Sequence, residues 1–205
     1  MNFLKSIAMT IVDFETTGIA SHGTISKGGV SRYPNEPWQV GWVSFVDGHV
    51  MRETQKSAYL KIDASRPFNK FAPGRHSQIR DVLHESPSLA DLWPEISKAL
   101  LGVTLVAHNV ATERGILAKA FPLHRFGPWV DTLTLSRKAW PGLASYALED
   151  LLERFGLSGR VAESCPGQAP HDALYDAVGA GVLLEHLLAQ PGWDVLRVED
   201  ALCSN

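Results

Sequence analysis

The sequence predicts an α/β fold in which a mixed sheet carries helices on its faces. Three strand-like stretches come first, at residues 7–12, 38–46 and 49–62, and Asp47-Gly48 between the second and third is a hairpin signal. From about residue 88 onward, helical and short strand-like stretches alternate. A meander of neighbouring strands followed by strand–helix crossovers gives a sheet with both antiparallel and parallel neighbours.

The composition is that of a globular protein with a sizeable core. The chain has 205 residues, of which 45% are hydrophobic and 20% are charged. No apolar run reaches the ~20 residues that span a bilayer, and no signal-peptide cleavage site follows the mildly apolar start. Cys165 and Cys203 lack metal-ligand spacing, which indicates a reducing, cytoplasmic setting. A net charge of -3 argues against broad electrostatic wrapping of nucleic acid, although metal ions in an acidic pocket can still grip a few phosphates.

The first strand carries the most informative residues. Apolar and β-branched side chains at 7–12 favour a buried strand, and Asp13 and Glu15 follow two residues apart. Alternate side chains of a strand share a face, so both carboxylates project to one side. Like charges this close favour a cation between them, and hard oxygen ligands suit Mg²⁺ or Mn²⁺. In the simpler alternative, one carboxylate caps a loop and the other is solvated. Thr16-Thr17-Gly18 then predicts a tight turn where a substrate backbone can approach.

Residues 19–37 are rich in Gly, Ser and Lys and show no clear period, which predicts a loop or a hairpin. This segment is either a surface insertion or a flap beside the carboxylates, in which His22, Lys27 and Arg32 meet phosphates. Residues 67–79 form a second predicted loop.

Helical periodicity and short apolar runs define the second half. A helix begins near Ser88, which resembles a capping box together with Asp91, and it runs to about residue 101. We predict one domain over residues 1–190, followed by a C-terminal tail at residues 191–205. The other predicted elements are strands at 104–107 and 129–131, helices at 111–121, 132–139 and 146–155, and a loop at 157–170.

The last strong helix covers residues 171–188, where apolar residues recur at helical spacing. Asp172 is well placed as its N-cap, so His171 lies just outside the helix and Asp176 lies within it. His171 is either a solvated histidine before a helix or a catalytic group. The acids in the same chain favour catalysis.

Four features occur together in a fixed order: Asp13-x-Glu15, His108-Asn109 followed by Glu113, Asp131-Thr132-Leu133, and His171 with Asp176. In combination they resemble the DEDDh family of 3′–5′ exonucleases, which includes polymerase proofreading subunits, ribonuclease T and oligoribonuclease. The resemblance covers residues 7 to about 188. It implies a ribonuclease-H-like fold, with a five-stranded mixed sheet flanked by helices. The stretches that carry it are 12–18, 106–109, 146–151 and 171–176.

The resemblance also implies roles for individual residues. Asp13, Glu15 and Asp176 match metal-binding carboxylates, and His171 matches the general base. The family's remaining acid is an Asp in the helix after the His-Asn pair. Glu113 takes its place here, and we predict a functional acid rather than only a partner of the helix dipole. The residues predicted to contact substrate are Thr16, Thr17, Ile19, His108 and Asn109. Of these, Ile19 is predicted to place an apolar side chain against the last base.

Several of these residues have a simpler structural interpretation. Asp131 is expected to cap the helix that follows it. His108 and Asn109 are expected to organise the loop before the next helix. Residues 146–151 are expected to be core and capping residues rather than part of a site.

The predicted function is a metal-dependent 3′–5′ exonuclease that uses two Mg²⁺ or Mn²⁺ ions and His171 as general base. It would release nucleoside 5′-monophosphates from 3′ ends of single-stranded DNA or RNA. Polymerases and repair or RNA-processing proteins are the partner classes implied, and no membrane partner is expected. Two functions compete with this prediction. One is a 3′-end-binding module with an impaired site, which Glu113 in place of Asp makes conceivable. The other is a ribonuclease-H-like endonuclease, which the position of His171 fits poorly.

Overall fold

The computed structural model describes residues 2–18, 20–21, 32–33, 35–66, 68 and 78–203. Five strands form one mixed sheet in the order β5-β4-β1-β6-β7, and the predicted five-stranded sheet is thereby confirmed. The meander β1-β4-β5 is antiparallel, whereas β1, β6 and β7 run parallel. The strands are β1 (Met9–Thr16), β4 (Pro37–Val46), β5 (His49–Tyr59), β6 (Thr104–Ala107) and β7 (Trp129–Asp131).

Strand β1 continues beyond the apolar run. It pairs with β4 as far as Thr16, so Asp13 and Glu15 lie on the strand towards its C-terminal end, as the prediction of a shared face requires. Asp47 and Gly48, with φ of 51° and 84°, form the predicted hairpin turn between β4 and β5. Positive φ at both central residues matches the right-handed twist of the flanking strands.

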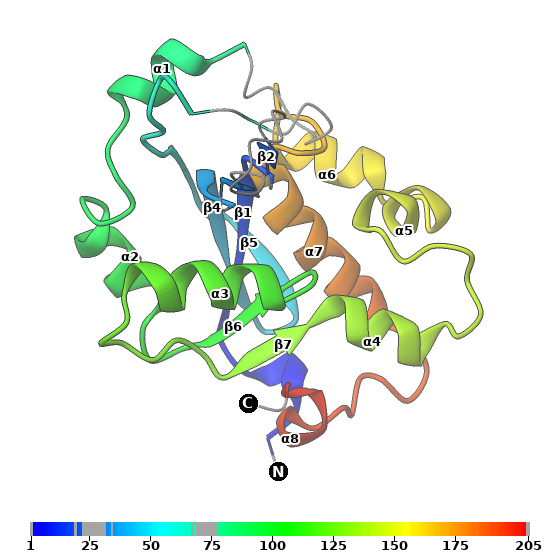
Figure 1. Cartoon of the computed structure of the whole chain (residues 1–205). Helices are drawn as coiled ribbons and strands as arrows, with labels where there is room; N and C mark the ends of the chain where they lie inside the picture. The colour runs from blue at the N-terminus through cyan, green and yellow to red at the C-terminus, as the bar shows by residue number, and fades with distance from the viewer. Residues whose placement is uncertain are drawn as a thin grey trace.

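Two layers of helices cover the sheet (Figure 1). On β1, Ile11 belongs to a core shared with α7, whereas Val12 and Phe14 pack on the opposite face with residues of α2 and α3. The alternation of strand side chains therefore divides the interior into two clusters. The main helices are α2 (Trp93–Leu100), α3 (Ala111–Ala120), α4 (Thr132–Ala139), α5 (Leu148–Arg154) and α7 (Ala173–Leu188). Within the described residues no helix is both long and apolar enough to cross a membrane.

Two predictions about helices are wrong. The expected loop at 157–170 contains α6 (Ser158–Ser164), whose buried Val161 packs in the core beside α7. Such a short helix depends on tertiary burial, which local pattern does not reveal. The helix expected from Ser88 begins at Trp93. Ser88 and Asp91 do exchange hydrogen bonds, from Ser88 N to Asp91 Oδ2 (2.8 Å) and from Asp91 N to Ser88 Oγ (3.3 Å), but these close a separate turn. Pro94 occupies the first turn of α2, which tolerates proline.

The remaining elements lie in segments that the sequence leaves irregular. Helix α1 (Arg80–Glu85) follows the second predicted loop, and α8 (Val198–Ala201) lies in the predicted tail. The tail packs against the body of the protein, because Leu4 N donates to Leu196 O (2.8 Å) and Cys203 N donates to Trp129 O (2.8 Å). Figure 1 shows α8 beside the N-terminus. The division of the chain at residue 190 stays a prediction.

The segment after β1 contains a small antiparallel ribbon. Strand β2 (Ala20–Ser21) pairs with β3 (Arg32–Tyr33), which agrees with the hairpin alternative for residues 19–37. Ile19, His22, Lys27 and the side chain of Arg32 lie outside the described part of the structure, and so does most of the predicted loop at 67–79.

Helix α7 is fastened to the β4–β5 hairpin near its C-terminal end. The buried carboxylate of Glu185 accepts the N–H of Val50 (2.6 Å) and pairs with Arg160 of α6. The ring of His49 lies 3.8 Å from the same carboxylate. Gly181 permits the close approach, because a Cβ there would lie 2.5 Å from Val50 Cγ2.

The N-terminal end of α7 touches β4 at Gly41. A Cβ at Gly41 would lie 2.3 Å from the backbone nitrogen of Leu174, a separation that no side chain can occupy. Gly41 is the partner of Asp13 in the sheet register. Glycine at this position therefore brings the start of α7 directly onto the acidic part of β1.

We predict that Gly41→Ala destabilises the protein by about 1–3 kcal/mol, the usual cost of overpacking a close contact. Gly115→Ala is the matched control, because no atom of another element lies within 4 Å of its Cβ position. Alanine is favoured over glycine inside a helix by up to about 1 kcal/mol, so this variant should be slightly more stable. Denaturant unfolding curves measure both. Equal stability of the two variants would contradict the close approach of α7 to β4.

Candidate active site

The carboxyl groups of β1 face α7. Asp13 and Glu15 lie on the same face as Ile11, opposite Gly41 and Gln39 of β4 in the register. Glu15 is only 8% exposed. Asp13 and Glu15 therefore lie on one face of the strand, as predicted. This face lies against the start of α7.

The start of α7 supplies His171 and Asp176. Asp172 occupies the predicted N-cap position, and His171 precedes it with a φ of 68°, a left-handed conformation that is uncommon outside glycine. The backbone N–H of His171 donates to Asp176 Oδ2 (3.2 Å), and its ring Nδ1 lies 4.0 Å from the same oxygen. Asp176 therefore holds the tight turn that presents the histidine.

These two elements bring three potential metal ligands together. Glu15, His171 and Asp176 each offer one ligand atom, and in the described part of the chain these atoms all lie within 4.8 Å of one another. They belong to residues 15, 171 and 176, so the sheet and α7 must dock before the cluster exists.

Glu113 enters from the other layer of helices. It lies in the first turn of α3, it is 2% exposed, and its Oε2 has no hydrogen-bond partner among the described residues. A carboxylate that only balanced a helix dipole would remain solvated, because burial of an unpaired charge is costly. Its negative charge acts on Asp13 and Glu15, so α3 contributes to the same site as β1.

Burial raises the pKa of every acid in this group, and the charges of other group members raise the pKa of Asp13 and Glu15 further. Burial raises the pKa of Asp13 well above its ordinary value, and the charges of Glu113, Asp176 and Glu15 raise it further. Burial, followed by the charge of Asp176, raises the pKa of Glu15 to about 9. Burial also raises the pKa of Glu113 to about 8 and that of Asp176 to about 6, while His171 opposes the shift of Asp176.

The donor set fits a divalent cation. The partnerless oxygen of Glu113 and the raised pKa values show that these carboxyl groups cannot all ionise at neutral pH without a compensating positive charge. Carboxylate oxygens are the ligands that Mg²⁺ and Mn²⁺ prefer.

Asp131 and the His108-Asn109 pair hold the loop that leads into α3. Asp131 accepts hydrogen bonds from Leu133 N (3.0 Å) and Asn109 N (3.0 Å), so its expected role as a helix cap is confirmed. His108 lies between Thr132 Oγ1 and the carbonyl oxygen of Tyr146, each 2.9 Å from one ring nitrogen. Burial lowers the pKa of His108. Both ring nitrogens are used within the protein, as expected for a residue that organises the loop. Contacts of His108 and Asn109 with substrate stay a prediction.

Hydrogen bonds of the buried Thr17 hold the turn that follows β1. Thr17 is fully buried, its N–H donates to Glu36 O (2.8 Å), and its Oγ1 accepts from Glu36 N (3.1 Å) and from Arg66 NH2 (3.4 Å). Gly18 follows with a φ of 66°. The side chain of Thr17 thus shapes the turn, and Thr16 is half-buried. Contacts of Thr16 and Thr17 with substrate stay predictions.

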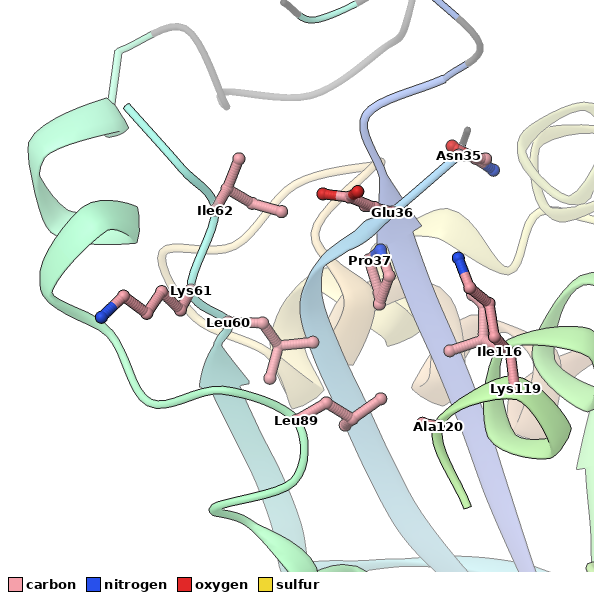
Figure 2. Close-up of a pocket in the computed structure, with 10 residues that line it drawn as sticks. All are labelled: Asn35, Glu36, Pro37, Leu60, Lys61, Ile62, Leu89, Ile116, Lys119 and Ala120. Atoms are coloured by element: carbon pink, nitrogen blue, oxygen red, sulfur yellow. The ribbon is translucent and has the colours of Figure 1, made fainter. Parts of the chain in front are cut away.

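A pocket of about 280 Å³ adjoins this turn through Glu36. Figure 2 shows apolar side chains of the segment after β5 and of α3 around it, with Glu36 and Lys119 among the polar groups. Its lining residues are Asn35, Glu36, Pro37, Leu60, Lys61, Ile62, Leu89, Ile116, Lys119 and Ala120.

Two residues near the site, Glu149 and Gln39, were not predicted from the sequence. Glu149 Oε2 lies 3.7 Å from His171 Nε2, so one residue of the 146–151 stretch, which was expected to be only core and capping, faces the site. The resemblance included this stretch but gave no reason to single out Glu149. Gln39 of β4 reaches the start of α7, and no local pattern indicates this.

The sequence is similar to those of known exonucleases and of a polymerase subunit. The chain matches the exonuclease family RNase_T over residues 10–180. Exodeoxyribonuclease 10 of Escherichia coli is 26% identical over 192 residues, which cover 94% of this chain and 74% of that protein. The DNA polymerase III subunit epsilon of Escherichia coli is 26% identical over 190 residues, which cover 89% of this chain and 70% of the subunit.

Solved nuclease structures share the fold. Exonuclease X in complex with 5′ overhanging duplex DNA has a TM-score of 0.68 at 25% identity and covers 94% of this chain and 96% of its own. The nuclease domain of 3′hExo, a DEDDh family member bound to rAMP, has a TM-score of 0.67 at 14% identity over 99% of both chains. S. pombe Pop2p in its Mg²⁺- and Mn²⁺-bound form has a TM-score of 0.63 at 12% identity, covering 95% of this chain and 87% of that one. At such low identity the last two likenesses show the fold alone.

The sheet order and the converging acids define a nuclease with a ribonuclease-H-like fold. The family match covers most of the chain, and the chain therefore belongs to the exonuclease family as a 3′–5′ exonuclease. The resemblance to DEDDh exonucleases is confirmed. Among the structural neighbours, S. pombe Pop2p was solved with Mg²⁺ and Mn²⁺ bound.

We predict that the metal-free protein loses stability as pH rises from about 4 to about 9. Carboxyl groups ionise near pH 4 in the unfolded chain, but in the folded chain the pKa of Glu15 is about 9 and that of Glu113 about 8. Between these limits the folded state binds more protons than the unfolded state, so the free energy of unfolding falls with rising pH. Glu113→Gln should flatten this slope.

Denaturant unfolding in excess chelator, at several pH values, measures the effect. The exposed Glu163 of α6 offers a matched control, and Glu163→Gln should keep the wild-type slope. Added Mn²⁺ should stabilise the wild type most at high pH. Identical slopes for wild type and Glu113→Gln would show that Glu113 is not part of the repelling group.

Proposed function

We propose that this exonuclease removes nucleoside 5′-monophosphates from the 3′ ends of single-stranded DNA or RNA by a two-metal mechanism with His171 as general base. The observation that carries the proposal is the convergence of four carboxyl groups from β1, α3 and α7 beside one histidine. It is the constellation that phosphodiester hydrolysis requires: a place for cations and a group that accepts a proton.

Asp13, Glu15, Glu113 and Asp176 would hold two Mg²⁺ or Mn²⁺ ions. When bound, the ions would activate a water and neutralise the charge on the phosphate and the departing 3′ oxygen. Glu113 is longer than the family's Asp by one methylene, so it would hold an ion either directly or through a retained water. Its burial and partnerless oxygen support a ligand role over a helix-dipole role.

His171 would take the proton of the attacking water. Its ring is 38% exposed and can therefore meet substrate, unlike the ring of His108. Asp176 accepts its backbone N–H, and Glu149 faces its Nε2. A neutral imidazole can accept a proton from a water molecule near neutral pH, which suits it to the role of a general base.

Substrate would lie along the Thr16–Gly18 turn, with Ile19 against the last base. We propose that the adjoining pocket receives a base, because its walls are mostly apolar and its volume of about 280 Å³ is open beside the turn. Exonuclease X bound to duplex DNA and 3′hExo bound to rAMP support a nucleic-acid 3′ end as ligand.

Likeness to a DNA polymerase III subunit supports polymerases as a partner class. Repair and RNA-processing proteins stay predicted partner classes. A cytoplasmic setting remains our expectation, supported by two free cysteines, Cys165 and Cys203.

A 3′-labelled oligonucleotide panel of single- and double-stranded DNA and RNA tests this function. We expect mononucleotide release that requires Mg²⁺ or Mn²⁺ and stops in excess chelator. Asp13→Asn should abolish it. Full activity in chelator would overturn the metal mechanism, and binding without cleavage would indicate an impaired 3′-end-binding module. Cleavage of circular single strands would indicate an endonuclease.

We predict that His171→Ala lowers kcat by a factor on the order of 10²–10⁴, the usual contribution of a general base. Mn²⁺ affinity should change little, because the carboxyl groups remain. Protonation of the base should slow the wild type at low pH, and the variant, which lacks the base, should not show this decrease. Steady-state rates between pH 5 and pH 9 measure both effects. An unchanged rate and pH profile would assign activation of the water to another group.

A further inference from the structure

We propose that Gln39 is a positioning residue of the site: its side-chain amide caps the first turn of α7 and thereby holds His171 and Asp176 against the acids of β1. For its effect on catalysis this inference rests on the proposed function. The contact itself is independent of that function.

Gln39 lies inside the protein at the junction of sheet and helix. It is 3% exposed and directly opposite Glu15 in the register, so the two side chains lie on the same face. Its Oε1 accepts the backbone N–H of Ala173 (3.2 Å), the first residue of α7, and its Nε2 donates to Ser57 Oγ of β5 (3.4 Å). The N–H of Ala173 requires an acceptor, which fixes the orientation of the amide.

The contact replaces the usual local cap. The first N–H groups of a helix have no partner within the helix, and an N-cap side chain normally supplies one. Asp172 occupies the N-cap position, but its side chain makes no cap hydrogen bond, and its Oδ2 accepts instead from Ala169 N (3.1 Å) in the preceding loop. The partner for the first turn of α7 comes from the sheet.

Gln39 and Gly41 contact consecutive residues in the first turn of α7. They are neighbouring same-face positions of β4, and they meet Ala173 and Leu174 respectively. Gly41 sets how near the helix can come, and Gln39 supplies a directional bond. Because Asp176 lies three residues after Ala173, a loosened first turn would move its carboxylate relative to Glu15.

The neutrality of the amide suits this location. Glu15 and Asp176 already repel each other, and burial strengthens the interaction. An amide oxygen satisfies the buried N–H without placing another full charge beside the two acids.

Four variants test the inference. Gln39→Met keeps the size but removes the acceptor, and Gln39→Asn keeps the amide but is too short to reach. Gln39→Glu retains an acceptor for Ala173 N–H and can accept from Ser57. Ser57→Ala removes only the outer hydrogen bond and serves as the matched control.

The exchange rates of the first-turn amides of α7, measured in the metal-free protein, report directly on the hydrogen bond from Ala173 to Gln39. We expect faster exchange of the first-turn amides of α7 in Gln39→Met and Gln39→Asn, with the rest of α7 unchanged, and wild-type exchange in the other two. Mn²⁺ binding by calorimetry should weaken about 10- to 100-fold in the first pair, as is usual when a residue supporting a ligand is lost. The Mn²⁺ concentration for half-maximal activity should rise in parallel.

Wild-type exchange and wild-type Mn²⁺ binding in both Gln39→Met and Gln39→Asn would overturn the inference. An equal loss in Ser57→Ala would also overturn it, because the cap remains in that variant. If Gln39→Met fails to fold, Gln39→Asn and Gln39→Glu decide the question. Absence of nuclease activity in the wild type would refute the proposed function alone, since exchange still reports on the cap.

Discussion

The constraint that the structure must meet is the burial of four carboxyl groups near one another. Burial raises the pKa of all four, Asp13, Glu15, Glu113 and Asp176, and repulsion within the group adds to the shifts of Asp13 and Glu15. No local structure would place them together, because they come from one strand and two helices on opposite faces of the sheet. The apolar clusters on both faces provide the compensating stabilisation, and they fix the acids as a consequence of core packing.

The sheet topology determines how the acids meet. Strand β1 is central and buried on both faces, so its α7-facing side can carry Asp13 and Glu15 while its other side packs on α3. Parallel pairing with β6 places the loop into α3 near the acidic end of β1, and Asp131 and His108 hold that loop in position. Charge at the site and rigidity around it thus come from different residues. Asp13 and Glu15 face the cation site, whereas Asp131 and His108 are occupied in hydrogen bonds within the protein.

Sequence reasoning predicted the parts of the site that depend on short spacing. Two residues on a strand place Asp13 and Glu15 on one face, and an N-cap followed by one helical turn places His171 near Asp176. The mixed sheet likewise followed from the order of elements, and its five strands followed from the family resemblance. The missing parts depend on tertiary contact. Helix α6 forms because Val161 is buried against its neighbours, Glu149 meets His171 across two helices, and Gln39 supplies the cap that Asp172 was expected to provide. Ser88 and Asp91 bonded as expected, but a local pattern could not tell a separate turn from a helix start.

The attachment of α7 at both of its ends has a consequence for how the site is assembled. Gln39 binds its first turn and Glu185 binds Val50 near its last, so the helix is fastened to the β4–β5 hairpin at both ends. Asp176 and His171 are thereby placed relative to β4, which also pairs with the strand that carries Glu15. Glu113 comes from the opposite layer, where α3 packs on the other face of β1. The separation between Glu113 and the other groups therefore depends on how both helices pack on the sheet.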